Sequence, residues 1–303
     1  LSERVPSNIS ITYQDLDIAT FTGTVTINKP SVAIANQSDS IIHTTVKADV
    51  FVMEDLSYVD YLFRKEIHIE DLKLFGAVVT YNKHLYNAVL KEKRNAPLKL
   101  YKPIIVDELS IDNARLTLYD STKDSLALRV DDVTLEMDDI RIDSSTLSRK
   151  LPFDYSGYDL DGSDIFVKVG NYENLDINKL FIKDKQAEVS NITFKTKYTR
   201  NELSRVISKE RDHFDLSIEK MDVDGLDVGF KEGRLFTIAK QLTLADVDAT
   251  IFRDKLKPDD VTQKKLYSAS LRQLDFDLGI DKTLIKNGTL TYIEKVKEDN
   301  SGG

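Results

Sequence analysis

The chain has 303 residues, of which 31% are charged and 41% hydrophobic, so it is expected to fold and to bury a core. Its formal net charge of −9 argues against a nucleic-acid-binding protein, because such proteins need a basic surface to displace counterions from phosphates. The chain has no cysteine, which excludes disulfides, thiolate metal ligands and a cysteine nucleophile. No stretch reaches the roughly 18 consecutive apolar residues that a membrane-spanning helix requires.

Alternation of apolar and polar residues is the dominant pattern, and it predicts about a dozen β-strands, each with one buried face. In 109–119, for example, the alternation runs to Ile111, is interrupted at Asp112 and Asn113, and resumes from Ala114. We expect the apolar positions of these strands to face a common interior. The positions chosen are Leu116, Leu118, Leu128, Val130, Leu135, Phe214, Leu216, Leu244, Phe276 and Leu278.

A short polar kink divides several of these strands. The segments 67–81, 109–119, 242–252 and 278–292 each place Asp, Asn or Gly between two apolar halves and end on an aromatic residue. These residue types tolerate the backbone angles of bulges and tight turns. The spacing of the segments is irregular, which indicates a loose repeat without the strict period of a solenoid.

Helices are predicted to be few and short. Residues 57–64 would place Val59, Leu62 and Phe63 on one helical face. Thr199 and Glu202 have the spacing of a capping box, and they would open a helix that turns Leu203, Val206 and Ile207 inward.

Two further segments are less defined. Pro258 opens a candidate helix that continues to Leu271, and 84–95 is either a short helix or a mobile connector. The charged stretch 91–97 ends in a proline and is a weak candidate for an internal boundary. Otherwise we expect 1–303 to form one elongated region, excised from a longer chain.

Periodicity leaves the architecture open. Many antiparallel strands with one apolar face can pack as a large β-sandwich or curl into an open gutter, and periodicity favours the sandwich. In a gutter something else must cover the apolar face, since large exposed apolar patches are rare in finished soluble monomers. Acyl chains are candidates for that cover, at ~0.8 kcal/mol per buried CH₂.

Three stretches resemble the AsmA-like family of bacterial envelope proteins, namely 11–34, 59–81 and 251–295. The first looks like the start of the family's periplasmic part, and the last resembles a block of uncharacterised AsmA-like proteins of Bacteroidota-type bacteria. The residues that carry the resemblance are Gly23, Thr24, Val25, Thr26, Ile27, Leu62, Phe63, Lys65, Ile67, Ile69, Leu72, Arg253, Asp254, Lys255, Pro258, Asp259, Asp260, Leu266, Tyr267 and Ser268.

The resemblance implies a mostly-β fold, an elongated, curved antiparallel β-sheet that forms an apolar groove, with a few short helices. It implies a non-enzymatic protein that binds or guides lipid acyl chains between membranes and serves outer-membrane homeostasis. It also implies a periplasmic location, with a tether to the inner membrane through an N-terminal helix absent from this chain. The alternative function is a structural or adaptor module that binds other envelope proteins. The family has no agreed catalytic residues.

Site chemistry of other kinds is weakly indicated. None of His43, His68, His84 and His213 has metal-ligand spacing, and surface histidines are expected. The acidic clusters 159–164 and 222–227 invite a calcium interpretation, but they lack the glutamate and glycine positions of an EF-hand, and turn chemistry explains them more simply. No nucleophile elbow, P-loop or dinucleotide motif is present. We therefore expect no catalytic site, metal or cofactor. Basic residues in 91–94 and 255–257 either line solvated loops or contact anionic head groups.

Overall fold

The computed structural model describes residues 6–87, 100–147, 149–260 and 276–297. The chain divides into two compact units: unit 1 comprises 1–165 and 181–184, and unit 2 comprises 166–180 and 185–303. Strands β11 (Gly157–Lys168) and β12 (Glu173–Lys183) have residues in both units. The predicted boundary at 91–97 lies outside the described residues.

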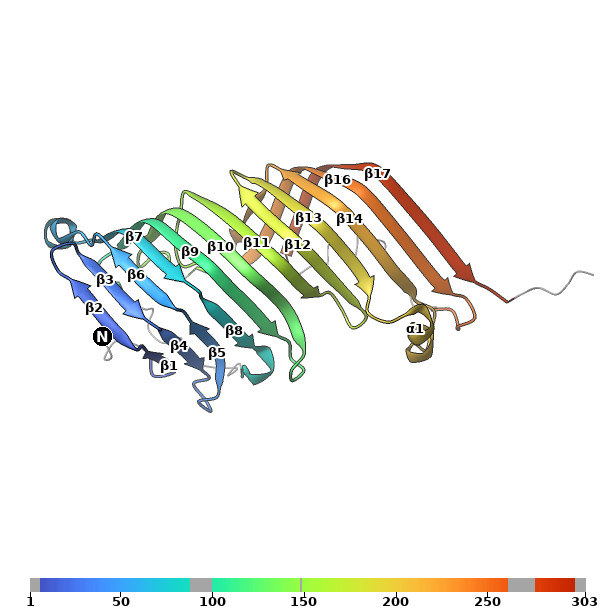
Figure 1. The fold of residues 1–303 in the computed structure, drawn as a ribbon, viewed down its shortest axis with the longest axis horizontal. Helices are drawn as coiled ribbons and strands as arrows, with labels where there is room; N and C mark the ends of the chain where they lie inside the picture. Colours follow the sequence, from blue (N-terminus) through green and yellow to red (C-terminus); the bar gives the residue numbers. More distant parts are fainter. Residues whose placement is uncertain (1–5, 88–99, 148, 261–275, 298–303) are drawn as a thin grey trace, which may run out of the picture. The chain divides into compact units, whose positions relative to one another are not determined.

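Strands β1 to β10 of unit 1 form six strand positions, which lie side by side in Figure 1, and most of β11 also belongs to this unit. Each of the first four positions is divided into two short strands, whereas the last two are single long strands. One set of short strands pairs in the order β2–β3–β6–β7–β9, the other in the order β1–β4–β5–β8–β9, and β9 pairs with β10. The bounds are β1 (Ile9–Thr12), β2 (Asp15–Ala19), β3 (Thr24–Asn28), β4 (Ser31–Ala35), β5 (Ile42–Lys47), β6 (Val50–Glu54), β7 (Ile67–Phe75), β8 (Val78–Asn82), β9 (Ile104–Tyr119) and β10 (Leu126–Ile142).

The interruptions of neighbouring strands are aligned in one row across unit 1. The Lys29 backbone N–H donates to the Asp49 carbonyl, and the Gly76 N–H donates to the Asp112 carbonyl, both at 2.9 Å. Lys29, Gly76 and Asn113 have positive φ angles of 48°, 62° and 52°. The kinks predicted in 67–81 and 109–119 are therefore confirmed as left-handed residues at a common row.

Small side chains follow this row on one face of the sheet. Ala48, Ala77 and Ala114 are buried and form a cluster against which Leu74, Ile111 and Val133 pack. A bulge bends its strand, so side chains on the inside of the bend converge. Alanine leaves enough room there for neighbouring strands to approach.

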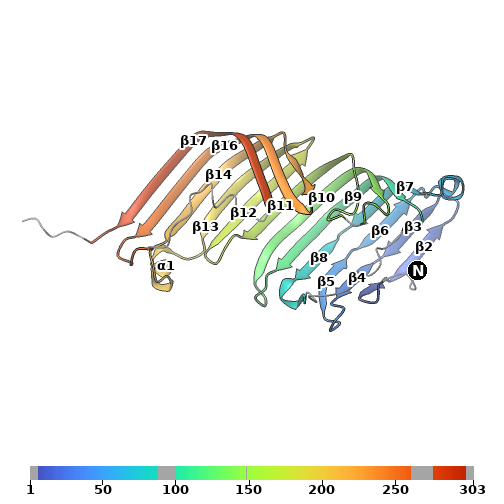
Figure 2. The ribbon, with the colours of Figure 1, turned by 180° about the vertical axis from the view of Figure 1, so that it is seen from behind.

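Unit 2 repeats this construction. Strand β13 (Gln186–Thr196) pairs with β14 (Asp212–Asp224), β14 and β15 (Asp227–Lys231) pair with β16 (Arg234–Asp254), and β16 pairs with β17 (Phe276–Lys295). Figure 2 shows β16 and β17 bending part-way along their length.

The kinks predicted in 242–252 and 278–292 are confirmed in these two strands. Asp246 and Asn287 have positive φ angles of 54° and 52°, and so does Asn191 of β13, at 53°. The Asn287 side-chain amide donates to the Asp246 carboxylate at 3.0 Å, which joins neighbouring kinks directly.

Three pairings depart from the predicted antiparallel arrangement. Strand β9 runs parallel to β7 and β8, and β17 runs parallel to β16. Parallel neighbours need a long crossover, and the connections 83–103 and 255–275 provide one in each unit. These are the segments in which the sequence predicts a helix or connector. Residues 83–85 form a 3₁₀ turn, and Pro258–Asp260 is not helical. The rest of 84–95 from residue 88 and the rest of 258–271 from residue 261 lie outside the described residues.

The capping box that opens α1 (Arg200–Val206) is confirmed. The Glu202 carboxylate accepts from the Thr199 backbone N–H at 2.9 Å, and the Thr199 hydroxyl accepts from the Glu202 N–H at 3.3 Å. Leu203 and Ile207 are buried as predicted. Val206 is 53% exposed, which corrects the prediction: within this short helix only Leu203 is buried.

The predicted helix at 57–64 is present as the π-helical turn η2 (Asp60–Arg64), preceded by two α-helical residues. Its attachment is polar. The buried Asp60 accepts from the His68 Nδ1 at 2.8 Å, and the other ring nitrogen of His68 lies 2.9 Å from the Asp107 carboxylate. Hydrogen bonding to Asp107 and then to Asp60 raises the pKa of His68, whereas the bond from His68 lowers the pKa of Asp60.

The kink at Gly76 gives the first prediction. A Cβ at this position would lie 2.2 Å from the Asp49 carboxylate, and the backbone is left-handed. Gly76→Ala is expected to lower the free energy of unfolding by about 2 kcal/mol, from the conformational cost and the displaced Asp49. Urea denaturation measures the loss. Gly233→Ala is the matched control, since Gly233 is also left-handed but its Cβ would meet nothing within 4 Å. An equal loss in both variants would contradict the proposed close approach.

The His68 network gives a second prediction, for pH. Because the folded-state pKa of His68 is raised, its stabilising contribution is complete below the unfolded pKa and is lost as pH rises through the folded value. The difference in unfolding free energy between wild type and His68→Gln should therefore shrink as pH rises above about 6.5, the ordinary pKa of histidine. His84→Gln controls for the removal of an imidazole elsewhere. A difference that does not vary over this range would refute the assigned role.

Candidate functional site

The strand register of unit 1 collects apolar side chains into rows on one face of the sheet. Each row crosses all six strand positions, because paired residues share a face. Between the kink row and η2 the two rows are Ile18–Val25–Met53–Leu72–Leu109–Met137 and Leu16–Ile27–Phe51–Leu74–Ile111–Leu135. Beyond the alanine cluster they are Ile11–Val32–Val46–Val79–Leu116–Val130 and Ile9–Ile34–Thr44–Tyr81–Leu118–Leu128. We call these rows, with the alanine cluster, the apolar face of unit 1.

The opposite face of unit 1 is polar. Thr117 and Arg129, each one position away from the apolar rows, are paired with one another. The Asp131 carboxylate forms ion pairs with Arg129 at 2.9 Å and with Arg115 at 3.5 Å. These ion pairs are partly exposed and contribute little to stability, but their charges make this face hydrophilic.

Unit 2 has an apolar face of the same kind. Its rows are Val189–Met221–Leu244–Ile285, Ile192–Ile218–Val247–Gly288 and Phe194–Leu216–Ala249–Leu290. The rings of Phe194 and Phe214 lie 5.6 Å apart and connect neighbouring rows. On the other face Lys220 lies between Glu188 and Asp222, at 2.9 and 3.0 Å.

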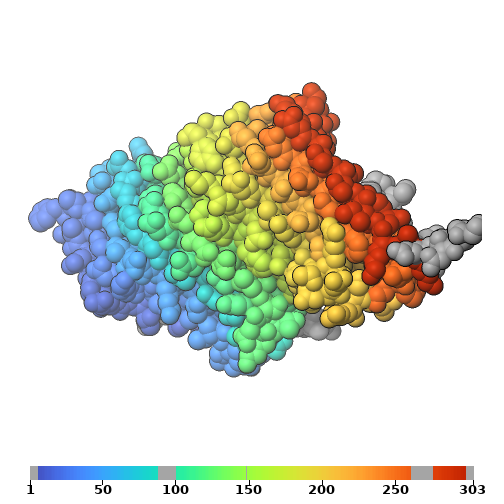
Figure 3. Space-filling model, turned by 45° about the vertical axis from the view of Figure 1, so that its right-hand side comes forward, coloured from blue at the N-terminus to red at the C-terminus, as the bar shows by residue number. Residues whose placement is uncertain are grey.

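The apolar faces are only half-buried. One end of the face in unit 1 is closed: Ile69, Val106 and Ile140 are 3–5% exposed and form a core that Phe153 and Tyr155 help to cover. Farther along, the side chains of the rows keep part of their surface in solvent. Within each unit the described strands form one sheet without a second layer of described strands, so the alternative sandwich is not supported. Figure 3 shows the side chains of neighbouring strands in contact over the surface of each unit.

The residues selected from the sequence fall into separate groups. Five lie together on the apolar face of unit 1, and three lie together on that of unit 2. Phe276 and Leu278 of β17 pair with Leu235 and Thr237 of β16, away from the other three in that unit, and Leu278 is 42% exposed. The unit 1 group is Leu116, Leu118, Leu128, Val130 and Leu135, and the first unit 2 group is Phe214, Leu216 and Leu244.

Sequence reasoning missed the part of the apolar face that the short strands supply. Phe51 of β6 lies between Ile27 and Leu74 in its row. The segment 50–53 is apolar throughout, so its alternation is hidden, although Val25 and Ile27 of the neighbouring strand do alternate with threonines. The alternation in 24–27 was therefore the sequence signal that could have identified this part of the apolar face.

The histidine and the acidic clusters described next contribute to packing and to turns. His43 is buried against Tyr81 and Tyr86, which corrects the expectation of surface histidines. Asp164 is a left-handed residue within β11, and Gly225 is a left-handed residue between β14 and β15. In the described ranges, no three His, Asp or Glu side chains are grouped so as to hold a metal ion. No helix there combines the length and apolar character that crossing a bilayer demands.

Comparison with known proteins gives no family assignment. The chain matches no protein-family model, and no curated protein matches it. Function must therefore be argued from the apolar faces themselves.

The half-buried state of the apolar face predicts how truncations behave. Ile69→Ala, at the closed end, is expected to cost about 2–5 kcal/mol of unfolding free energy. Leu116→Ala removes as many carbon atoms from an open part of the face, and should cost less than about 2 kcal/mol. Chemical denaturation of both variants tests this. Equal losses would mean that Leu116 sits in a closed core.

Proposed function

We propose that the chain is a non-enzymatic lipid-binding protein whose apolar faces hold acyl chains and guide them between membranes. The observation that carries this proposal is the set of apolar rows that cross all six strand positions of unit 1 while staying half-exposed. Extended apolar surface of this kind is rare in soluble proteins unless something binds it.

An acyl chain fits the chemistry of these rows. The rows offer aliphatic and aromatic contacts, with an occasional threonine, and no charged side chain among those in register. Burying about ten methylene groups gains up to ~8 kcal/mol before the costs of association are subtracted. A face with so few polar groups selects for chain hydrophobicity more than for a particular head group.

The cellular setting of this proposal comes from the resemblance to AsmA-like proteins in 11–34, 59–81 and 251–295. On that basis we place the protein in the periplasm, tethered to the inner membrane by a helix outside this chain, with a role in lipid transport and outer-membrane homeostasis. The bent, single-layer sheets of both units support a groove, which is the fold that the resemblance implies.

An adaptor module is the second candidate, and one observation favours it. Strand β17 is 20 residues long, and its side chains Ile285, Leu290 and Tyr292 are exposed. A long strand with exposed apolar side chains can pair with a strand of another envelope protein. In that case the edge, rather than the face, would be the binding site.

A pair of substitutions tests lipid binding. Leu116→Glu places a carboxylate in the apolar face, whereas Thr117→Glu places it one residue away on the polar face beside Arg129. Both variants should stay folded, because a half-exposed carboxylate can reach water. Leu116→Glu should weaken binding of a fluorescent fatty acid by at least about tenfold, since the charge would lie where the chain must lie. Thr117→Glu should bind as wild type does.

Mass spectrometry of lipid extracted from the purified wild-type protein gives an independent reading. Co-purified lipid supports the proposal. A wild-type protein that carries no lipid and binds no fatty-acid probe would reject it and favour the adaptor function. So would equal probe binding by wild type and Leu116→Glu.

A further inference from the structure

An exposed apolar cluster lies at one end of the sheet of unit 1, away from the rows described above. It is centred on η2 and the residues just before it. Val59, Leu62 and Phe63 are 65%, 68% and 81% exposed, although the sequence places them on one helical face typical of a buried contact. The helical turn therefore presents its apolar side to solvent and its acidic residue, Asp60, to the protein.

The turn between β2 and β3 brings a further aromatic residue to this end. The Leu56 backbone N–H donates to the Gly23 carbonyl at 3.2 Å, and a Cβ on Gly23 would touch the Leu56 backbone at 2.8 Å. This close approach joins the turn to the segment that leads into η2. Phe21, two residues before Gly23, is fully exposed. In Figure 1 this turn and the helical coil lie at the same end of β2, β3 and β6.

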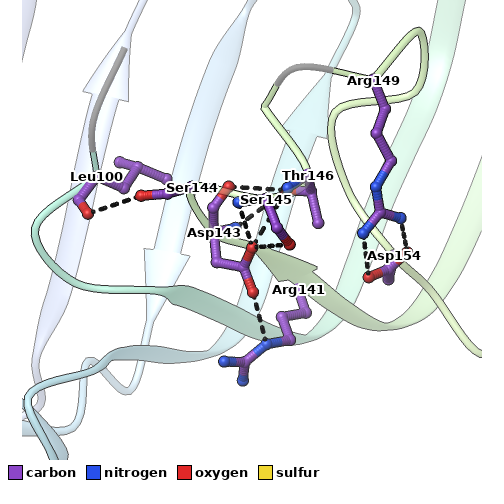
Figure 4. A network of polar contacts seen from close by, with 8 residues as sticks. All are labelled: Leu100, Arg141, Asp143, Ser144, Ser145, Thr146, Arg149 and Asp154. Atoms are coloured by element: carbon purple, nitrogen blue, oxygen red, sulfur yellow. Dashed lines mark hydrogen bonds and ion pairs between the residues drawn. The ribbon is translucent and has the colours of Figure 1, made fainter. Parts of the chain in front are cut away.

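The segment before β9 contributes Tyr101, which is 88% exposed. The Lys102 ammonium donates to the Tyr61 carbonyl at 2.6 Å and lies 3.2 Å from the centre of the Tyr61 ring. The Ser144 hydroxyl donates to the Leu100 carbonyl at 3.2 Å, from a turn ordered around Asp143 (Figure 4). Tyr101 is thus held between two fixed residues beside η2.

The turn around Asp143 is itself strongly hydrogen-bonded. The Asp143 carboxylate accepts from the Ser145 hydroxyl at 2.6 Å and from the Ser145 N–H at 2.8 Å. These bonds lower the pKa of Asp143 to about 2, so the carboxylate that accepts them is ionised at neutral pH. The turn that contacts Leu100, the residue before Tyr101, is therefore closed by several hydrogen bonds.

The charges that η2 exposes are positive. Asp60 is buried and bonded to His68, and it also pairs with Arg64 at 3.2 Å. Arg64 and the C-cap residue Lys65 are exposed, and the ammonium of Lys102 contacts Tyr61 of the same turn. A chain with net charge −9 thus combines exposed aliphatic and aromatic side chains with cations at this end.

We propose that this cluster, Phe21, Val59, Leu62, Phe63 and Tyr101 with Arg64 and Lys65, docks on the surface of a membrane that contains anionic lipid. Apolar side chains of a surface helix insert at the boundary between head groups and acyl chains, and tyrosine is enriched at that boundary. Lysine and arginine reach from there to anionic head groups. The polar anchor through Asp60 and His68 holds the apolar side chains outward, so they are available without rearrangement.

A single introduced tryptophan tests insertion. The chain has no tryptophan, so Phe63→Trp carries a unique fluorophore at the centre of the cluster. Adding vesicles of phosphatidylcholine and phosphatidylglycerol should shift its emission to the blue, and brominated lipids should quench it. Phe230→Trp is the matched control, because Phe230 of β15 is also exposed. Emission from Phe63→Trp that ignores the vesicles, or shifts no more than the control, would overturn the proposal and leave a protein partner as the occupant.

Vesicle co-sedimentation measures the contribution of the side chains. The double variant Leu62→Ser, Phe63→Ser should bind these vesicles at least about tenfold more weakly than wild type. Lys65→Asn, which keeps a residue suited to the left-handed C-cap, should weaken binding to phosphatidylglycerol-containing vesicles about fivefold and leave the weaker binding to phosphatidylcholine alone unchanged. Unchanged binding by the double variant refutes the docking site.

Docking and acyl-chain binding can fail separately. Leu62→Ser, Phe63→Ser should still bind the fluorescent fatty acid, and Leu116→Glu should still bind vesicles. If the double variant lost the fatty acid as well, with its stability unchanged, the cluster would belong to the acyl-chain site and the separate docking role would be rejected.

Discussion

The rest of the structure depends on a backbone constraint, the left-handed kink that neighbouring strands share. Side chains alternate along a strand, so an apolar face would change sides wherever a bend shifted the period by one residue. At each kink one extra residue is inserted, and its left-handed neighbour turns the chain so that the apolar side chains on either side of the kink stay on one face. Ile111 and Ala114 of β9, for example, are three residues apart and pack together across Asn113. In β16, Leu244 and Val247 have the same spacing across Asp246. The sheet can therefore bend while its apolar side stays on the inside.

Local features of this arrangement were predictable. The kinks at Asn113, Asp246 and Asn287 could be recognised because Asn and Asp are among the few residues that accept left-handed angles cheaply, and they interrupt a clear alternation. The capping box at Thr199 was also recognisable, because its two partners are only three residues apart in the sequence. The apolar positions of β9 and β10 followed from alternation alone, and the register brings them together.

Other features depend on contacts between distant segments. Nothing local says that β17 returns to run parallel to β16, because the direction is set by the length and path of the crossover. The exposure of Phe63 was equally hidden, since a helical apolar stripe looks the same whether it faces a core or solvent. What turns it outward is the bond of Asp60 to His68, 8 residues farther along the chain, and His68 is in turn bonded to Asp107, 47 residues after Asp60.

A single-layer sheet also changes how stability is distributed. In unit 1 each strand position is hydrogen-bonded to its immediate neighbours, and the described strands have no second layer to lock them together. Such a unit resembles a one-dimensional array, in which stability is the sum of nearest-neighbour terms. Opening can then begin at the outermost position, β1 and β2, and stop part-way, so that backbone amides exchange with solvent in a gradient toward β9. Cooperativity over short distances would let one end of the face loosen to admit a bulky molecule while the other end keeps its shape.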